Sequence, residues 1–271
     1  MVKGQSMKKK FLLVISCLLF LFGCGTSKQE DSTELKKIVV GSDNYPPFVY
    51  LDESGNPTGI DVDIAKEAFK RMGYDAQIVT IDWVKKSELV DSGQIDCIWG
   101  CFSIAGRENL YNWSDPYMVS TQGVAVNKTS DIYSLADLEG KVVAVQTTSK
   151  PEEIFLNKLD DRIPELKNVI STDSRAVQYA ALDCGYVDAI ASHITAIEQY
   201  KKDYGSDFRI LDETLFTTGI GVAFSKNDTR GLQKELSEVF KQMKQDGTLA
   251  LIVGKYLDNP ETYLEVESLE N

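Results

Sequence analysis

An alternation of strands and helices begins twice along this chain, and it limits the folds that are open to it. Residues 38–41 predict a short buried strand, and apolar residues at helical spacing predict a helix that begins near Asp61 and ends before Gly73. A strand, a helix and another strand follow at residues 75–81, 84–92 and 96–102. This order predicts an α/β lobe built on a mainly parallel sheet.

The second series begins near residue 135 and predicts a second α/β lobe. It contains helices at residues 135–138, 152–160, 174–184 and 194–204, and strands at residues 141–146, 169–171 and 189–192. A long helix at residues 229–246 follows it. The chain is therefore expected to be an α/β protein with two lobes in tandem.

Two similar segments flank the second lobe, GVAVNK at residues 123–128 and GVAFSK at residues 221–226. A chain that leaves one lobe and returns to it needs two connecting strands, so we predict a two-strand hinge here. On pattern alone, both segments could also be interior strands of one domain. The predicted boundaries place residues 36–124 and 222–260 in lobe 1, residues 125–221 in lobe 2, and residues 261–271 in a C-terminal tail.

The N-terminal segment has the pattern of an export signal. Three lysines at residues 8–10 precede an apolar stretch at residues 11–22, which is shorter than the roughly 20 apolar residues of a membrane span. The Leu-x-Gly-Cys ending resembles the bacterial lipoprotein signal, with plain secretion as the alternative. We therefore expect residues 1–23 to be removed, Cys24 to be diacylated, residues 24–35 to act as a tether, and the protein to be anchored extracytoplasmically to the cell membrane.

Composition argues against several classes of partner. The formal net charge of −12 argues against a nucleic-acid surface, which requires clustered Lys and Arg. A single histidine and five cysteines without C-x-x-C spacing predict no metal site and no cofactor. Cys97 and Cys101, if both lie on one strand, are about 13 Å apart and cannot form a disulfide with each other.

Several short motifs together carry a family resemblance. They are GSDNYPPF at residues 41–48, GIDVDI at 59–64, SGQID at 92–96, Arg107, WSDPY at 113–117, LEGK at 138–141 and GVAF at 221–224. The chain resembles the extracellular solute-binding proteins of polar amino-acid ABC transporters, which have the type II periplasmic-binding-protein-like fold. The resemblance implies a monomeric, non-enzymatic receptor that captures a polar amino acid or a related small carboxylate between two lobes and presents it to a membrane permease.

The chemistry of such a ligand indicates which residues would bind it. A zwitterionic amino acid needs a guanidinium or backbone amides for its carboxylate and an acceptor for its ammonium. Arg107 is the predicted carboxylate anchor, because its planar fork can donate two parallel hydrogen bonds. The resemblance implies that Ser103 and the backbone at Cys101 also contact the ligand. It also adds Thr148 and Ser149, which precede a helix whose N-terminus offers amides to an anion.

Further candidates follow from the same resemblance. Tyr45 matches an aromatic wall that stacks on the ligand, and Asp43 is expected to face the same cleft and accept a hydrogen bond. Trp83 is a further candidate, although packing in the core explains a large aromatic equally well. Asp61 stands at the start of a predicted helix, where capping or support of the helix dipole is the expected role.

His193 departs from the family pattern. Alignment through residues 185–190 places His193 where family members use an acidic residue to hold the ammonium of the ligand. A neutral imidazole accepts one hydrogen bond but supplies no charge, and we expect it to titrate at about pH 6 to 7. The ligand is then expected to carry an extra anionic group or to lack the ammonium.

Two other classes of function stay open at this point. The first is a cyclohexadienyl-dehydratase-like enzyme on the same fold, with His193 as general acid or base. The second is the ligand-sensing domain of a signalling receptor. A lone histidine without an evident partner and the expected lipid anchor both favour capture over catalysis.

Overall fold

The computed structural model describes residues 35–266 and confirms the predicted two-lobe α/β class. The predicted signal peptide, Cys24 and the tether before residue 35 lie outside the described residues. The first lobe is built on a mixed five-stranded sheet with the order β4-β1-β5-β12-β6. Its strands are β1 (Lys36–Ser42), β4 (Tyr74–Thr80), β5 (Cys97–Ile98), β6 (Asn112–Trp113) and β12 (Ala223–Phe224).

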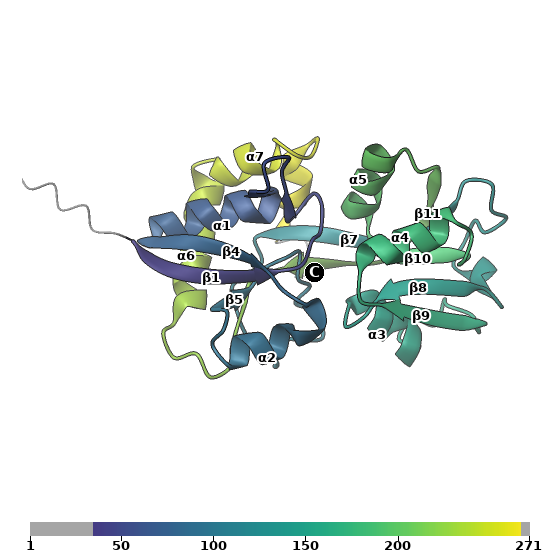
Figure 1. Cartoon of the computed structure of the whole chain (residues 1–271), viewed down its shortest axis with the longest axis horizontal. Helices are drawn as coiled ribbons and strands as arrows, with labels where there is room; N and C mark the ends of the chain where they lie inside the picture. The colour runs from purple at the N-terminus through teal and green to yellow at the C-terminus, as the bar shows by residue number, and fades with distance from the viewer. Residues whose placement is uncertain (1–34, 267–271) are drawn as a thin grey trace, which may run out of the picture. The chain divides into compact units, whose positions relative to one another are not determined.

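Helices cover both faces of the first sheet. Along β1 the side chains alternate, so that Ile38 and Val40 join one core and Val39 joins another. The first core lies under the helices α1 (Ile60–Arg71), α6 (Leu232–Gln245) and α7 (Thr248–Val253), and the second lies on the side of α2 (Lys86–Asp91) (Figure 1).

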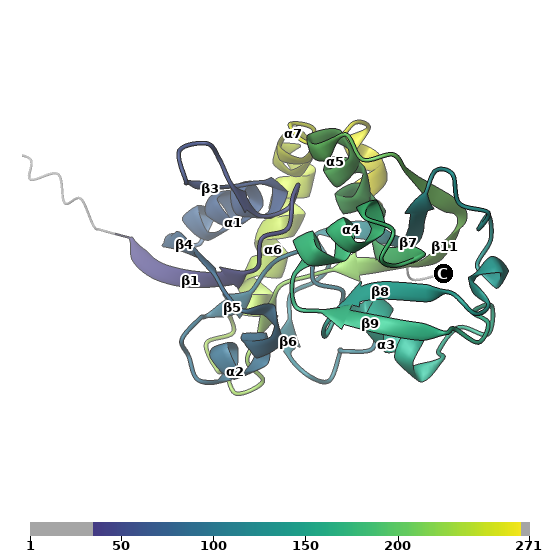
Figure 2. The same ribbon diagram turned by 45° about the vertical axis from the view of Figure 1, so that its right-hand side comes forward.

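The second lobe repeats this arrangement on a sheet with the order β11-β7-β10-β8-β9. Its strands are β7 (Met118–Asn127), β8 (Val142–Gln146), β9 (Asn168–Thr172), β10 (Ala189–His193) and β11 (Phe208–Ile220). Val124 and Val126 pack on the side of α3 (Lys150–Asn157), whereas Ala125 packs on the side of α4 (Arg175–Asp183) and α5 (Ile194–Tyr204) (Figure 2).

The two lobes are joined by the antiparallel pair β7 and β11. Their register runs from Met118 opposite Ile220 to Asn127 opposite Phe208. The first predicted hinge segment, residues 123–128, largely falls within β7. The second, residues 221–226, is not a crossing strand, because Ala223–Phe224 pairs with β5 and β6 inside the first sheet. The returning strand is β11, which the hydrophobic pattern did not reveal.

The remaining elements are short. They are β2 (Tyr50–Leu51), β3 (Pro57–Thr58), η1 (Trp83–Lys85), η2 (Ala136–Leu138) and η3 (Pro260–Tyr263). Leu264 falls in the predicted C-terminal tail, yet it is buried in the core of the first lobe. The exact boundaries between the lobes stay a prediction.

The three cysteines within residues 35–266 are free thiols. Cys97 and Cys101 are both free, which confirms the prediction that they do not form a disulfide with each other. These two thiols are buried, whereas Cys184 is exposed. The predicted strand at residues 96–102 is shorter than expected, because β5 ends at Ile98 and Cys101 has a positive φ of 48°. Between residues 35 and 266 no helix is long and apolar enough to cross a bilayer, and no cluster of His, Cys, Asp and Glu is placed to hold a metal ion.

Candidate functional site

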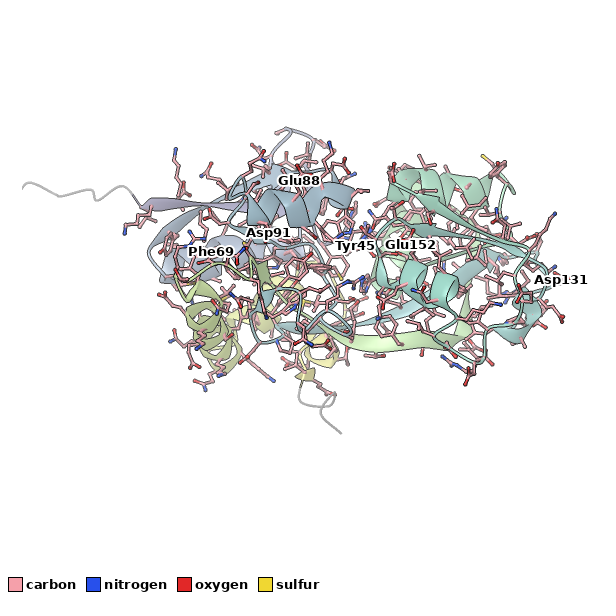
Figure 3. All side chains as sticks on the ribbon, turned by 90° about the horizontal axis from the view of Figure 1, so that it is seen from below. Tyr45, Phe69, Glu88, Asp91, Asp131 and Glu152 are labelled. Atoms are coloured by element: carbon pink, nitrogen blue, oxygen red, sulfur yellow. The ribbon has the colours of Figure 1, made fainter. Side chains whose placement is uncertain are left out.

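A cavity that is open to solvent lies between the two lobes, with about 370 Å³ of space including the solvent at its opening. Figure 3 shows this junction, with Tyr45 on the first lobe and Glu152 on the second. All of the predicted ligand-binding residues except Asp43 line the cavity: Tyr45, Trp83, Cys101, Ser103, Arg107, Thr148, Ser149 and His193. The lining also contains residues that the sequence did not single out, among them Gln122, Gln146, Lys150, Arg175, Gln178 and Ser192.

Asp61 fixes the loop that follows β5. Its Oδ2 accepts a hydrogen bond of 2.7 Å from the backbone N–H of Cys101, and its Oδ1 accepts one of 2.7 Å from the hydroxyl of Tyr117. Burial raises the pKa of this carboxyl to about 6. The predicted capping is wrong, since no side chain caps α1, whereas Asp61 does lie in the first turn of this helix, where it can support the helix dipole. Asp61 also occupies the Cys101 N–H, which therefore is not free for a ligand.

Arg107 follows this loop and reaches the cavity with weak internal partners. Its guanidinium donates to the carbonyl oxygens of Ser103 and Thr148 at 3.4 Å each. The nearest carboxylate contact is with Glu153, at 3.9 Å. Burial lowers the pKa of Arg107 from its ordinary value, but a guanidinium remains charged. Strong donors are thus left available toward the cavity.

The start of α3 forms the opposite wall. Ser149 caps this helix, because its Oγ accepts from the N–H of Glu152 at 3.3 Å, and Pro151 lies in the first turn. Glu152 in turn accepts a 2.6 Å hydrogen bond from the N–H of Thr148. Thr148 has a positive φ of 59°, which turns the chain from β8 into the helix beside the cavity.

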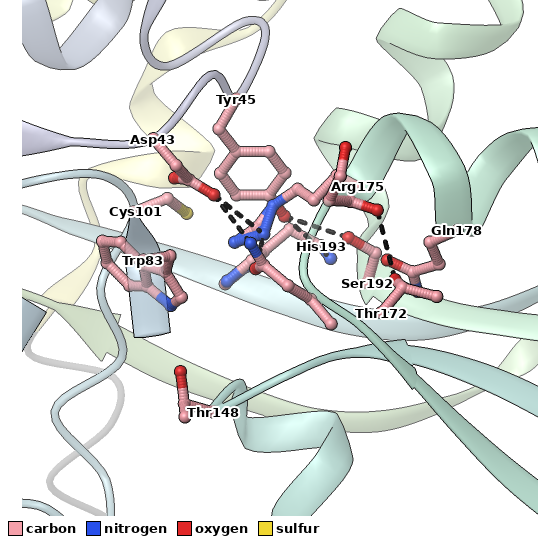
Figure 4. A network of polar contacts seen from close by, with 12 residues as sticks. Asp43, Tyr45, Trp83, Cys101, Thr148, Thr172, Arg175, Gln178, Ser192 and His193 are labelled. Atoms are coloured by element: carbon pink, nitrogen blue, oxygen red, sulfur yellow. Dashed lines mark hydrogen bonds and ion pairs between the residues drawn. The ribbon is translucent and has the colours of Figure 1, made fainter. Parts of the chain in front are cut away.

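Arg175 is the main residue that sequence reasoning missed. Its guanidinium carbon lies 3.3 Å from the centroid of the Tyr45 ring and covers the aromatic face that was predicted to stack on a ligand. The same guanidinium donates to Oε1 of Gln146 and lies 3.7 Å from Oδ2 of Asp43. Asp43 also accepts from Nε2 of Gln146 at 2.7 Å. Arg175 thus extends from the second lobe to Asp43 and Tyr45 of the first (Figure 4).

His193 lies at the end of β10 and is neutral. Its Nε2 faces Nε2 of Gln122 at 3.2 Å, and its Nδ1 lies 2.6 Å from Oγ of Ser120. The amide donates to the first nitrogen, so the second carries the proton and donates to Ser120. Burial and the positive charge of Arg175 lower the pKa of His193 to about 3. The expected titration at about pH 6 to 7 is therefore wrong.

Trp83 combines both of the roles left open for it. It packs edge-to-face on Phe102 in the core and also lines the cavity, whereas Trp99 belongs to the core alone. Lys86 lies 4.8 Å from the centroid of the Trp83 ring and donates across the junction to Oγ1 of Thr148 at 2.7 Å. Burial and the charge of Arg107 lower the pKa of Lys86 to about 8.

Three cations at or beside the cavity that the sequence analysis did not single out occupy the same position in their helices. Lys86, Lys150 and Arg175 are the first residues of α2, α3 and α4. The N-terminal end of a helix is the positive end of its dipole, so a cation there is unfavourable unless something else holds it. A Lys or Arg repeated at the first position of a helix is the sequence pattern that could have identified these residues.

Comparisons with known proteins agree with this fold. Residues 38–259 match the bacterial extracellular solute-binding proteins, family 3. The arginine-binding extracellular protein ArtP of Bacillus subtilis (strain 168) is 30% identical over 92% of this chain and 98% of its own length. A structure of an ancestral arginine-binding protein bound to arginine has a TM-score of 0.74 at 29% identity, covering 82% of this chain and 98% of that chain.

A third comparison bears on the enzyme alternative. The ancestral amino acid-binding protein AncCDT-1, a precursor of cyclohexadienyl dehydratase, has a TM-score of 0.72 at 26% identity, covering 81% of this chain and 95% of that chain. The similar proteins are binding proteins, and this chain is one too rather than an enzyme. Its fold is that of the type II periplasmic binding proteins. The chain belongs to the bacterial extracellular solute-binding proteins of family 3.

Proposed function

We propose that this protein is the extracytoplasmic substrate-binding component of an ABC importer. It captures a polar amino acid or a related small carboxylate between its lobes and presents it to a permease, acting as a monomer. The observation that carries this proposal is the cavity, whose lining comes from both lobes. Arg107 is its carboxylate anchor, and Ser103, Thr148 and Ser149 add polar contacts.

Closure of the lobes is the proposed mechanism. Direct contacts already cross the junction, from Tyr45 Oη to Ser192 Oγ at 3.0 Å and from Lys86 Nζ to Thr148 Oγ1 at 2.7 Å. A ligand that contacts both walls adds binding energy in the closed state only, and it therefore shifts the population toward that state. The strands β7 and β11 connect the lobes throughout this motion.

Two measurements on the mature protein test capture. Native mass spectrometry of the protein as purified identifies any retained solute, and small-angle X-ray scattering follows the radius of gyration as that solute is removed and returned. A smaller radius with the solute is expected, because the lobes close on it. An unchanged radius at saturating solute argues against closure as the mechanism.

Lipid anchoring at Cys24 is the second part of the proposal, supported by the Leu-x-Gly-Cys sequence at residues 21–24. The variant Cys24→Ala is expected to accumulate as an unlipidated precursor, because the acceptor thiol is absent. Detergent partitioning and the mass of the cellular protein check this. If the variant has the wild-type size and partitioning, Cys24 is not the lipidation site.

A further inference from the structure

The described residues that line the cavity carry positive charges and no negative ones. Among the described residues that line it, three are cations, Arg107, Lys150 and Arg175, and none is Asp or Glu. A fourth cation, Lys86, is 4% exposed and lies behind Trp83 and Thr148. A positively charged ligand group would therefore meet cations and no carboxylate in the wall.

Two carboxylates behind the wall contact these cations directly. Glu153 lies 3.0 Å from Lys150 and 3.9 Å from Arg107, so one carboxylate serves two cations. Asp43 serves Arg175 at 3.7 Å. Within the described part of the chain, Lys86 has no carboxylate within 4.0 Å and donates only to Thr148 and to the carbonyl of Trp83. Four cations thus share two direct carboxylate contacts, while Glu108 and Glu152 act on Arg107 and Lys86 from a longer distance.

Helix geometry adds to the positive potential at the cavity wall. Lys150 and Arg175 are the first residues of α3 and α4, where the helix dipole already contributes positive potential. Burying like charges together is costly unless an anion compensates them. Burial, followed by the charge of Arg107, lowers the pKa of Lys86, and the charges of Asp43 and Glu152 offset this only in part.

The polar atoms left unpaired indicate what the ligand brings. Nε of Arg175, Oε1 of Gln122 and Oε1 of Gln178 line the cavity, are buried and have no hydrogen-bond partner in the part of the chain that the structure describes. Oδ1 of Asp43, which lies behind the wall beside Arg175, has none either. Nε of Arg175 is a charged donor that can donate to an anion. The two amide oxygens are uncharged acceptors, which can accept from a hydroxyl without neutralising an ammonium, and Gln122 contacts the neutral His193.

We propose that the cavity selects a small organic dianion of the dicarboxylate class that carries no ammonium group. One carboxylate binds Arg107, and the other binds Nε of Arg175, which makes Arg175 the residue that determines specificity. Lys86 and Lys150 supply the remaining positive potential. This inference rests on the proposed function, since it names the ligand class for the same cleft.

Calorimetry with matched ligands tests the charge requirement. Succinate and butyrate have the same chain length and differ in one carboxylate, whereas aspartate is succinate with an added ammonium. Succinate or its longer homologue glutarate is expected to bind on the order of 100-fold more tightly than the matching monocarboxylate, the range for one buried charge pair. Succinate is also expected to bind more tightly than aspartate, and arginine to bind most weakly.

Variants separate specificity from folding. Arg175→Gln removes the charge and should reduce the preference for the dicarboxylate over the monocarboxylate to less than about 10-fold, whereas Arg175→Lys should retain more of it. A purely structural role of Arg175 would weaken both ligands equally. His193→Asp supplies a carboxylate beside the cavity and should reverse the preference from succinate toward aspartate, and it tests the inference even where Arg175→Gln fails to fold.

The outcomes distinguish the two proposals. If arginine or glutamine binds more tightly than succinate and glutarate, or if a retained solute has fewer than two anionic groups, the dianion inference is wrong and the proposed function stands. If no small molecule is retained and none binds saturably, both are wrong. Equal affinities for succinate and butyrate in the wild-type protein also overturn the inference.

Discussion

Arg107 and Arg175 reach the same cavity from opposite lobes, and their side chains are similarly buried, with 11% and 9% of their surface exposed. Their partners differ. Arg107 makes two long hydrogen bonds to carbonyl groups and stands 3.9 Å from Glu153. Arg175 stacks on Tyr45, donates to Gln146 and lies beside Asp43.

The difference separates two uses of a buried cation. A guanidinium with weak internal partners still has its strongest hydrogen bonds to make, and a ligand carboxylate completes them. A guanidinium with strong internal partners also holds the closed arrangement of the lobes, because its contacts with Asp43 and Tyr45 cross the junction. Arg107 is therefore expected to matter mainly for binding, and Arg175 for both binding and stability.

The largest expected effect is on binding at Arg107. The variant Arg107→Ala should lose about 2 to 5 kcal/mol of binding free energy, because a buried charge pair with the ligand carboxylate loses one partner. Arg107→Lys is the matched control and should be intermediate, since it keeps the charge without the planar fork. Calorimetry with the retained solute measures both. A loss below about 0.5 kcal/mol in the alanine variant would mean that Arg107 is not the anchor.

The two arginines should also differ in how much they contribute to the free energy of unfolding without ligand. Arg175→Gln should lower it by about 1 to 3 kcal/mol, because Asp43 loses its cation and its Oδ1 already lacks a partner among the described residues. Arg107→Ala should lower it by less than about 1 kcal/mol, since its internal contacts are long. Urea denaturation at one pH gives both values. Equal losses of unfolding free energy in the two variants would show that Arg175 does not stabilise the closed lobes more than Arg107 does.

The smallest expected effect concerns His193 and pH. Its pKa is lowered to about 3 in the folded state, so below its ordinary value of 6.5 the unfolded chain binds the proton and the folded chain does not. Stability from this group is fully present above pH 6.5 and should fall by about 1.5 kcal/mol between pH 6.5 and 5. The raised pKa of Asp61, which burial brings to about 6, acts in the opposite direction.

A variant isolates the contribution of His193. In His193→Gln the imidazole is absent, while Asp61 and every other titrating group remain. The difference in unfolding free energy between wild type and this variant should therefore shrink by about 1.5 kcal/mol from pH 6.5 to 5. A difference that stays constant over this range would show that His193 is not held neutral in the fold.

Local patterns predicted much of the fold. The helix at Ile60–Arg71 ends next to Gly73, and Ala189–His193 followed by Ile194–Tyr204 appear almost where the sequence placed them. Strand β11 was missed, because Asp212 and Glu213 interrupt its hydrophobic pattern and its length depends on pairing with β7. Long-range pairing of this kind leaves little trace in a window of ten residues.

Part of the candidate site was predicted from the family resemblance. Ser103, Arg107 and Ser149 line the cavity as expected. Lys86 and Arg175 were missed, because a charged residue on a short helix usually faces solvent, and only the closeness of the two lobes makes these side chains neighbours. The state of His193 was also out of reach, since its pKa depends on burial and on Arg175 rather than on adjacent residues.

The arrangement of the free cysteines has a practical consequence for spectroscopy. Within residues 35–266, Cys184 is the exposed thiol, while Cys97 and Cys101 are buried. A maleimide dye or a nitroxide should therefore attach selectively beside the end of α4, on the second lobe. A second cysteine introduced on an exposed helix position of the first lobe would complete a donor–acceptor pair, and opening and closing could then be recorded one molecule at a time.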